Sequence, residues 1–183
     1  MRSPAEPPVR PSVRVNGSPA IRCPDADAVV TARPTVAHSG KGWHELALCR
    51  PLLRAVKDLG FERPTPIQAA SIPLALAGRD ICGAATTGSG KTAAFMLPVL
   101  ERLVYRPRRI ASTRVLVVTP TRELAVQIHA MTTKLGQHTD VRVAMAVGGL
   151  SLQTQETSLR TRPDIVVATP GRMIDLIRNS NSI

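Results

Sequence analysis

Aromatic residues are scarce in this chain, which contains only Trp43, Phe61, Phe95 and Tyr105. A binding surface built from many aromatic rings, each stacked on a base, is therefore excluded. If the chain binds a nucleic acid, we expect its contacts to go mainly to phosphate and sugar groups.

Cysteines and long apolar runs are also limited. The cysteines Cys23, Cys49 and Cys82 are too few and too scattered for a disulfide framework or a zinc site, which favours a reducing compartment. No apolar run approaches the roughly 18 residues of a membrane-spanning helix, and the N-terminus lacks the apolar stretch of a secretory signal. We therefore expect a soluble intracellular protein.

Acidic residues are outnumbered by basic ones. The 24 Lys and Arg residues against 13 Asp and Glu give a formal net charge of +11. This excess favours a polyanionic partner, either a nucleic acid or an anionic membrane surface. Hydrophobic residues make up 43% of the chain, which is enough for the core of about one domain.

Residues 1–42 differ in composition from the rest. Seven prolines interrupt any helical or strand period, and six basic residues against three acidic ones leave a net charge of +3. We expect a disordered Pro/Arg-rich tail. The alternative is a transit peptide, but Asp25, Asp27 and the prolines disfavour the amphipathic helix that such a peptide needs.

From Trp43 onward, helical and strand patterns alternate. We expect helices at 51–59, 66–77, 90–104, 122–135, 151–160 and 171–178, and strands at 80–84, 114–119, 141–147 and 164–168. Near-continuous apolar strands alternating with helices indicate an α/β fold, in which at least four strands form a parallel sheet with helices on both faces. Ligands of such folds bind beyond the carboxyl ends of the strands.

The first turn after a strand is rich in glycine. Gly88 and Gly90 allow successive N–H groups to face a phosphate, Lys91 can reach the β- and γ-phosphates, and the Thr92 hydroxyl can bind Mg²⁺. The strict phosphate-loop pattern has Gly where this chain has Ala85. The alternative, a turn with a solvated lysine, is disfavoured by the strand before it and the helix after it.

Two later turns place an arginine in the first turn of a helix. Thr121 and Thr169 suit the cap position, but the helix dipole disfavours cations such as Arg122 and Arg172 there. A bound anion would compensate, and the repetition indicates a track for a phosphate backbone. For each arginine alone, a surface ion pair is the alternative. The glycine pair at 148–149 permits the close approach of a backbone or a ligand, but by itself it is weak evidence for a binding site.

Upstream of the phosphate loop, Gln68 offers both a donor and an acceptor. Paired hydrogen bonds to an adenine edge need this combination, although such a glutamine is more often an exposed helix residue.

The segments GFERPTPIQ (60–68), ATTGSGKT (85–92), PTRELA (120–125), GG (148–149) and TPGR (169–172) occur in this order. Together they resemble the amino-terminal motifs of the DEAD-box ATP-dependent RNA helicases. Trp43 lies 17 residues before Gly60, where the family places an isolated aromatic residue, usually Phe. The sequence around these motifs resembles that of the nucleolar subgroup, which acts in large ribosomal subunit assembly.

The resemblance implies a RecA-like P-loop NTPase fold, ATP and Mg²⁺ as cofactors, and RNA as partner. It implies a Q-motif region over 43–68 and a partial RecA-like ATP-binding domain over 69–183. It implies adenine contacts from Trp43, Phe61, Arg63, Thr65 and Gln68. It implies phosphate contacts from Ala85, Thr86, Thr87, Gly88, Ser89, Gly90, Lys91 and Thr92, with Lys91 and Thr92 catalytic and Thr92 also binding the metal. It implies contacts to the RNA sugar-phosphate backbone from Thr121, Arg122, Gly148, Gly149, Thr169, Gly171 and Arg172.

The sequence lacks the family's Asp-Glu-Ala-Asp strand, its Ser-Ala-Thr motif and its second RecA-like domain. We therefore expect a helicase fragment that binds nucleotide weakly and does not unwind RNA. We also expect an incomplete sheet with marginal stability, which associates through an open edge. A non-catalytic ATP- and RNA-binding module and an unrelated P-loop NTPase are the alternative functions. The resemblance implies a nuclear, nucleolar location and pre-ribosomal particles as partners.

Overall fold

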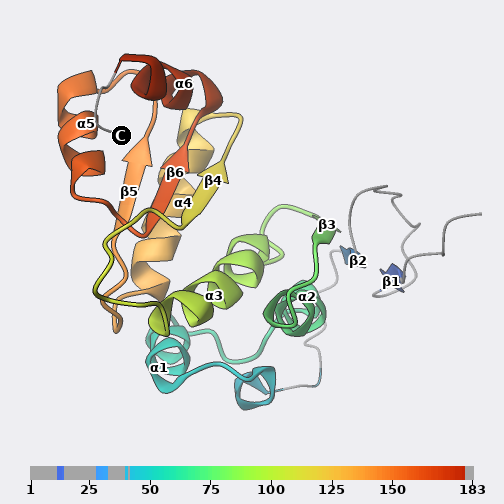
Figure 1. Ribbon diagram of the computed structural model, residues 1–183. Coiled ribbons are helices and arrows are strands. Elements are labelled where there is room, and N and C mark those ends of the chain that lie inside the picture. Colours follow the sequence, from blue (N-terminus) through green and yellow to red (C-terminus); the bar gives the residue numbers. More distant parts are fainter. Residues whose placement is uncertain (1–11, 15–27, 33–39, 41, 180–183) are drawn as a thin grey trace, which may run out of the picture. The chain divides into compact units, whose positions relative to one another are not determined.

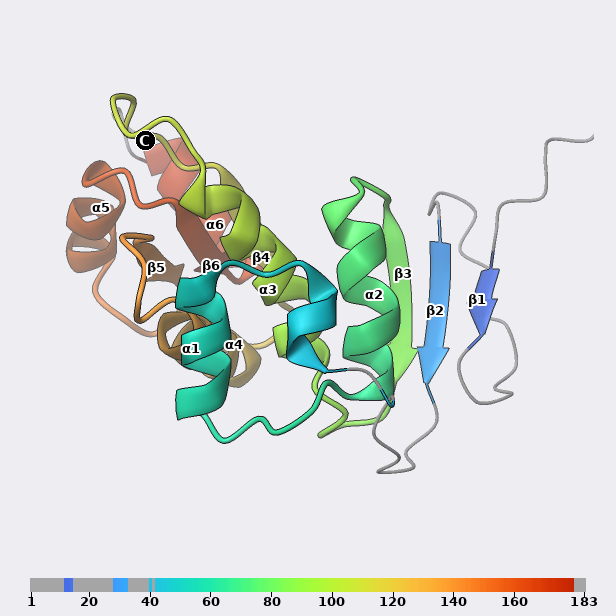
Figure 2. The ribbon, with the colours of Figure 1, turned by 90° about the horizontal axis from the view of Figure 1, so that it is seen from below.

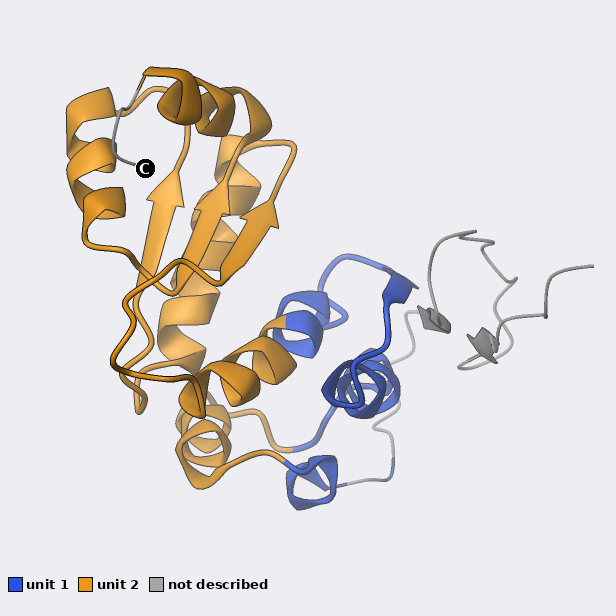
Figure 3. Ribbon diagram, viewed as in Figure 1, with its two compact units in different colours: residues 1–47, 63–95 blue, residues 48–62, 96–183 orange. Residues whose placement is uncertain are grey.

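The computed structural model describes residues 12–14, 28–32, 40 and 42–179. The chain forms two compact units, which Figure 3 shows in different colours. Unit 1 comprises residues 1–47 and 63–95, and unit 2 comprises residues 48–62 and 96–183. Each unit contains one three-stranded parallel sheet.

The sheet of unit 1 has the order β1-β2-β3. Its strands are β1 (Ser12–Arg14), β2 (Ala28–Ala32) and β3 (Ile81–Ala85). Helix α2 (Pro66–Leu76) packs against β2 and β3, as Figure 2 shows. The core of this unit is a cluster of Val30, Ile67 and Ala94.

Strands β1 and β2 fall within residues 1–42, for which the sequence predicted a disordered Pro/Arg-rich tail. The segment that forms β2 contains Val29, Val30 and Thr31 and no proline, so it can extend and pair along its whole length with β3. Apart from Gly40 and Gly42, the rest of the predicted tail lies outside the described residues.

The sheet of unit 2 has the order β4-β6-β5, with β6 in the centre (Figure 1). Its strands are β4 (Val115–Val118), β5 (Val143–Ala146) and β6 (Ile165–Ala168). The first residues of all three strands are paired in register, so their carboxyl ends reach the same edge. All four residues of β6 are buried, as expected for a central strand that is covered on both faces.

Five helices lie wholly or partly in unit 2. They are α1 (Arg50–Asp58), α3 (Lys91–Val104, which begins in unit 1), α4 (Arg122–Leu135), α5 (Leu152–Arg160) and α6 (Pro170–Asn179). Leu159 of α5 and Leu176 of α6 pack against Ala144 and Val166 of the sheet, while α4 packs against β5 and β6.

The local signals for helix ends are confirmed. Pro51 lies in the first turn of α1, and Gly60 follows that helix with a φ of 71°, the left-handed conformation that glycine adopts without strain. Pro73 was predicted to bend or divide the second helix. It does not divide the helix, because α2 continues through Pro73 to Leu76.

The parallel order of the strands is confirmed, but their division between two sheets was not predicted. Hydrophobic periodicity identifies strands without identifying their partners, which depend on contacts between distant segments. No helix within the described part of the chain is long and apolar enough to cross a membrane.

Candidate functional site

The glycine-rich loop of unit 1 joins β3 to α3, as the sequence predicts for a phosphate-binding loop. Gly88 and Gly90 have φ angles of 80° and 88°, which strongly favour glycine. The first residues of α3 follow directly, so the unpaired N–H groups of this helix terminus lie next to the loop.

The Lys91 side chain folds back over this loop. Its ammonium group donates to the carbonyl oxygens of Ala85 at 2.6 Å and Thr86 at 2.7 Å. The Ser89 hydroxyl donates to the same Thr86 carbonyl at 2.7 Å. The loop therefore holds a positive charge beside its backbone, which suits an anionic phosphate group.

Gln68 connects the start of α2 to the glycine-rich loop. Its side chain is buried, its Oε1 accepts from the Thr65 N–H at 2.9 Å, and its Nε2 donates to the Gly90 carbonyl at 3.1 Å. A Cβ atom at Gly90 would collide with Nε2. One donor and one acceptor of the amide stay available, which is the pair that recognition of adenine needs. That role stays a prediction.

The Thr65 hydroxyl oxygen is buried and has no hydrogen-bond partner among the residues that the structure describes. It lies 3.2 Å from the position that a Cβ atom at Gly90 would take. A buried hydroxyl without a partner costs free energy, so this atom marks a place where a polar ligand group would be stabilised.

The remaining predicted nucleotide contacts differ in exposure. Trp43 is buried in the short 3-10 helix η1 (Trp43–Leu46), and Arg63 is exposed. Thr87 is also exposed, whereas Thr92 is half-buried in the first turn of α3. Phe61 belongs to unit 2, whereas the other predicted nucleotide contacts belong to unit 1.

The described residues contain no group of three His, Cys, Asp or Glu side chains that could hold a metal ion. The Thr92 hydroxyl as a metal ligand stays a prediction.

In unit 2, the structure brings together the three turns that the sequence singled out. Thr121 caps α4, its hydroxyl accepting from the Leu124 N–H at 3.3 Å. The next residue, Arg122, places its guanidinium against Gly149, so a Cβ atom there would require the Arg122 side chain to move. Arg172 of α6 donates to the Leu150 carbonyl at 3.1 Å. Two arginines from different helices thus meet one glycine-containing turn.

The other predicted residues of this edge leave room above the backbone. A Cβ atom at Gly148 or at Gly171 would meet no other atom within 4 Å. The Thr169 N–H donates to Ala146 at 2.9 Å, which fixes the end of β6 beside the end of β5. We refer to the seven predicted RNA-contacting residues together as the motif edge.

The contacts of Arg122 and Arg172 go to uncharged backbone. Neither arginine therefore pairs with an acidic side chain among the residues that the structure describes at the motif edge. The anion that the sequence predicts beside them is not supplied by such a side chain. Their predicted contacts to a phosphate backbone stay a prediction.

Gln155 is a residue that the sequence argument missed. It is buried on α5, where its Oε1 accepts from the Val147 N–H at 3.0 Å and its Nε2 donates to the Val147 carbonyl at 2.9 Å. These two hydrogen bonds fix the backbone just before Gly148. The signal was a glutamine four residues before Leu159, on the apolar face of an expected helix.

Comparison with known proteins assigns the family. The model of the DEAD/DEAH box helicase family matches residues 65–183. The chain belongs to this family.

Relatives within the family are highly similar. The chain is 67% identical over 139 residues to "DEAD-box ATP-dependent RNA helicase 28" of Oryza sativa, covering 76% of this chain and 17% of that protein. It is 58% identical over 146 residues to "ATP-dependent RNA helicase drs1" of Schizosaccharomyces pombe, covering 80% of this chain and 19% of that protein. This DEAD-box chain thus spans less than a fifth of the length of these relatives.

Solved helicases share the fold. The RNA helicase Prp28 of Chaetomium thermophilum, crystallised with ADP, matches with a TM-score of 0.71 and 43% identity over 78% of this chain and 35% of that one. An ATP-dependent RNA helicase from Sulfolobus tokodaii, described as hypothetical, matches with a TM-score of 0.64 and 39% identity over 72% of this chain and 37% of that one. Membership of this family sets aside the alternative of an unrelated P-loop NTPase.

Proposed function

We propose that this chain is the nucleotide- and RNA-binding part of an ATP-dependent RNA helicase. Unit 1 binds ATP through the loop at 85–92, and unit 2 binds the sugar-phosphate backbone of RNA at the motif edge. The observation that carries the proposal is the convergence of Arg122 and Arg172 on the turn at 148–150, at the ends of three parallel strands.

The nucleotide site is supported by three features of unit 1. They are the left-handed glycines of the loop, the Lys91 ammonium held over its carbonyls, and the buried Thr65 hydroxyl without a partner among the described residues. Mg²⁺ bound to nucleotide phosphates keeps several waters and needs only one or two protein ligands, so a single Thr92 oxygen fits it. The ion would neutralise charge on the phosphates.

The RNA site is supported by charge and by access. Arg122 and Arg172 supply cations at one edge, and the backbone at Gly148 and Gly171 is open to close approach. Contacts of this kind recognise phosphate and sugar without reading bases. We infer that the site binds RNA independently of sequence.

The wider role rests on resemblance. The sequence resembles the nucleolar subgroup of the family, and "ATP-dependent RNA helicase drs1" of several fungi is among the similar proteins. We propose a role in ribosome biogenesis on pre-ribosomal particles in the nucleolus. For these 183 residues alone, which lack the Asp-Glu-Ala-Asp segment, we expect binding of nucleotide and RNA without unwinding.

The test compares binding of fluorescent ATP and GTP analogues to the wild type, Lys91→Ala, Gln68→Ala and the control Lys57→Ala, an exposed residue of α1. We expect the wild type to prefer ATP. Lys91→Ala should weaken both nucleotides by about tenfold or more, because it removes a charge-assisted phosphate contact. Lys57→Ala should change neither.

Gln68→Ala should remove the preference for ATP over GTP. The ratio of the two affinities is the readout, because a general loosening of the loop would weaken both nucleotides alike. Equal binding of GTP by the wild type would show that Gln68 does not read adenine. Unchanged binding by Lys91→Ala would exclude the loop as the phosphate site.

A further inference from the structure

The loop between α3 and β4 forms a basic surface at the edge of the unit 2 sheet that the motifs do not use. Arg114, Arg142 and Asp164 each stand directly before a strand, so they share the amino edge of the sheet with this loop. The motif edge follows the carboxyl ends of the same strands. A four-residue strand spans about 13 Å, so the two edges are separate surfaces. We call residues 105–113 the basic loop.

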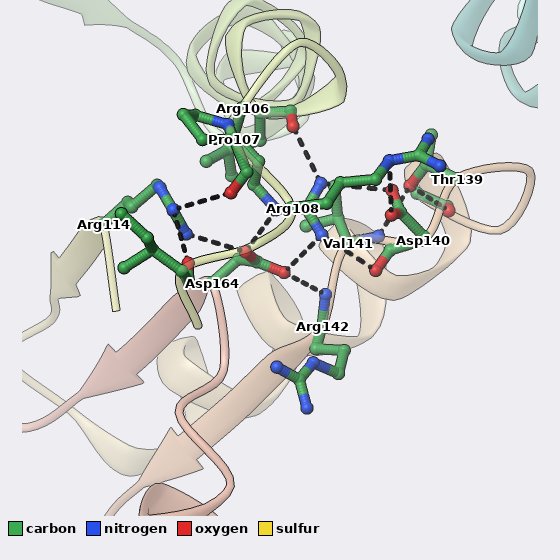
Figure 4. A network of polar contacts seen from close by, with 12 residues as sticks. Arg106, Pro107, Arg108, Arg114, Thr139, Asp140, Val141, Arg142 and Asp164 are labelled. Carbon is green, nitrogen blue, oxygen red and sulfur yellow. Dashed lines mark hydrogen bonds and ion pairs between the residues drawn. The ribbon is translucent and has the colours of Figure 1, made fainter. Parts of the chain in front are cut away.

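Two arginines that point inward hold the basic loop in shape. The Arg114 guanidinium donates to the Pro107 carbonyl at 3.2 Å, as Figure 4 shows. It also donates to the carbonyls of Ile110 at 2.8 Å and Ser112 at 3.0 Å. Three carbonyls of one loop thus converge on one cation. Such bracing lowers the entropy that the loop would lose when it binds a partner.

Arg106 anchors the start of the loop. Its side chain is 9% exposed and pairs with the buried carboxylate of Asp164, through both Nε and Nη2, and with Asp140 at 3.1 Å. Partial burial favours the neutral form of Asp140, but the hydrogen bond from Arg106 and the charges of Arg106 and Arg108 outweigh it and lower the pKa of this carboxyl. Both aspartates are therefore used to hold the loop.

The outward side chains of the loop are cationic and apolar. The Arg108 side chain is 74% exposed and forms one ion pair, with Asp140 at 3.4 Å. Arg109 is exposed and has no ion pair with any residue that the structure describes. Tyr105 is 73% exposed and Ile110 is 65% exposed. Two exposed arginines thus follow an exposed aromatic residue by three and four positions in the same loop.

The net charge of this region favours an anionic partner. The loop and the residues before the strands include five arginines (106, 108, 109, 114 and 142) and two aspartates (140 and 164), which gives a net charge of +3. Guanidinium groups bind phosphate through paired hydrogen bonds, and an exposed tyrosine ring offers a platform for one base. An acidic peptide would use the arginines but would have no need of the ring.

We propose that the basic loop is a second RNA-binding surface, which holds single-stranded RNA by its phosphates on Arg108 and Arg109 and by one base on Tyr105. The surface lies outside the motif edge, so a long RNA would contact both edges of unit 2. A short RNA would bind at one edge at a time. This inference goes beyond the proposed function and stands on different residues.

The experiment measures binding of a fluorescent 24-nucleotide oligo(U) to the full chain over a range of salt concentrations. The variants are R108A/R109A and the control R54A/K57A, which removes two exposed charges from α1. We expect R108A/R109A to weaken binding about tenfold at low salt and to reduce the slope of log K against log salt by about 1.4, from two lost phosphate contacts. The control should lose much less.

A second readout locates the RNA on the loop. Tyr105 is the only tyrosine of the chain, so a cross-link from 4-thiouridine RNA to the peptide that contains it is unambiguous by mass spectrometry. We expect this cross-link in the wild type and its loss in Y105A. Equal losses of affinity in R108A/R109A and R54A/K57A, or the absence of the cross-link, would overturn the proposal.

Two further outcomes separate this proposal from its neighbours. If an oligoglutamate competes as well as an RNA of equal charge, the loop is a surface for acidic protein and the proposal is wrong. If R122A and R172A leave RNA binding intact while R108A/R109A weakens it, the motif edge fails as the RNA site and the basic loop stands. The reverse pattern rejects the basic loop alone.

Discussion

Gln155 illustrates how a single buried side chain can position a turn for which RNA contacts are predicted. Its side-chain amide forms hydrogen bonds with both the N–H and the C=O of Val147, immediately before the glycine pair at 148–149. Neither group of Val147 reaches water in this position, because the residue is fully buried. The turn at the motif edge therefore depends on a helix that carries none of the family's motifs.

We expect Gln155→Ala to destabilise the chain by about 2–4 kcal/mol, because it leaves one buried donor and one buried acceptor without partners. Urea unfolding monitored by circular dichroism measures this change. Gln153→Ala is the matched control, since Gln153 lies on the same helix but is exposed. RNA affinity measured on folded protein should also fall for Gln155→Ala. Equal stability of the two variants would contradict the bracing role.

At the residue level, the sequence identified the chemistry better than the contacts. The glycines and the lysine at 85–92 predict a phosphate-binding loop, and Gly88 and Gly90 have the left-handed conformation that such a turn needs, while the phosphate contacts themselves stay a prediction. The same reasoning could not show that Gln68 bonds to Gly90, or that Arg122 lies against Gly149. Those partners are distant in the sequence, and only the folded backbone brings them together.

Among the elements, helices were predicted more closely than sheets. The bounds of α4 are those that the sequence indicates, because Thr121 caps one end and Gly136 stands directly after the other. β1 and β2 were missed, since a three-residue and a five-residue strand between prolines carry little periodic signal. The pairing of β2 with β3 depends on contacts across about 50 residues, which no local pattern encodes.

The buried carboxylate of Asp164 joins several elements at the amino edge of the unit 2 sheet. It pairs with Arg106 after α3 and with Arg114 before β4, and it accepts from the Arg142 N–H before β5 at 2.9 Å. The Asp164 side chain is 4% exposed, so water can solvate its surroundings only poorly. Neutralising this carboxylate would therefore leave the guanidinium groups of Arg106 and Arg114 without a counter-charge.

We expect Asp164→Asn to destabilise the chain by roughly 3–5 kcal/mol, as measured by urea unfolding, because it breaks a buried ion pair by removing one partner. Asp140→Asn is the control, since its carboxylate is 47% exposed and its pairs are screened by solvent. That variant should remain close to the wild type. A loss of stability no larger for Asp164→Asn than for Asp140→Asn would show that the network contributes little.

At the scale of the whole molecule, the exposed edge of β4 is the feature with the widest consequence. Among the described strands, β4 pairs only with β6, so no described strand covers its other edge. Leu116 and Val118 on this strand are 50% and 56% exposed. An apolar strand with an open edge is a template for pairing with another chain.

We expect the 183-residue chain to self-associate through β4, with an average mass in sedimentation velocity that rises with protein concentration. Leu116→Lys should reduce this association strongly, because it adds a charge to the edge strand and removes exposed apolar surface. Ile177→Lys is the control, since Ile177 is a comparably exposed apolar residue on α6. A concentration-independent monomer, with a cooperative urea transition of several kcal/mol, would show that the open edge carries neither association nor instability. Equal effects of the two lysine variants would instead assign association to exposed apolar surface in general, because only Leu116 lies on the edge strand.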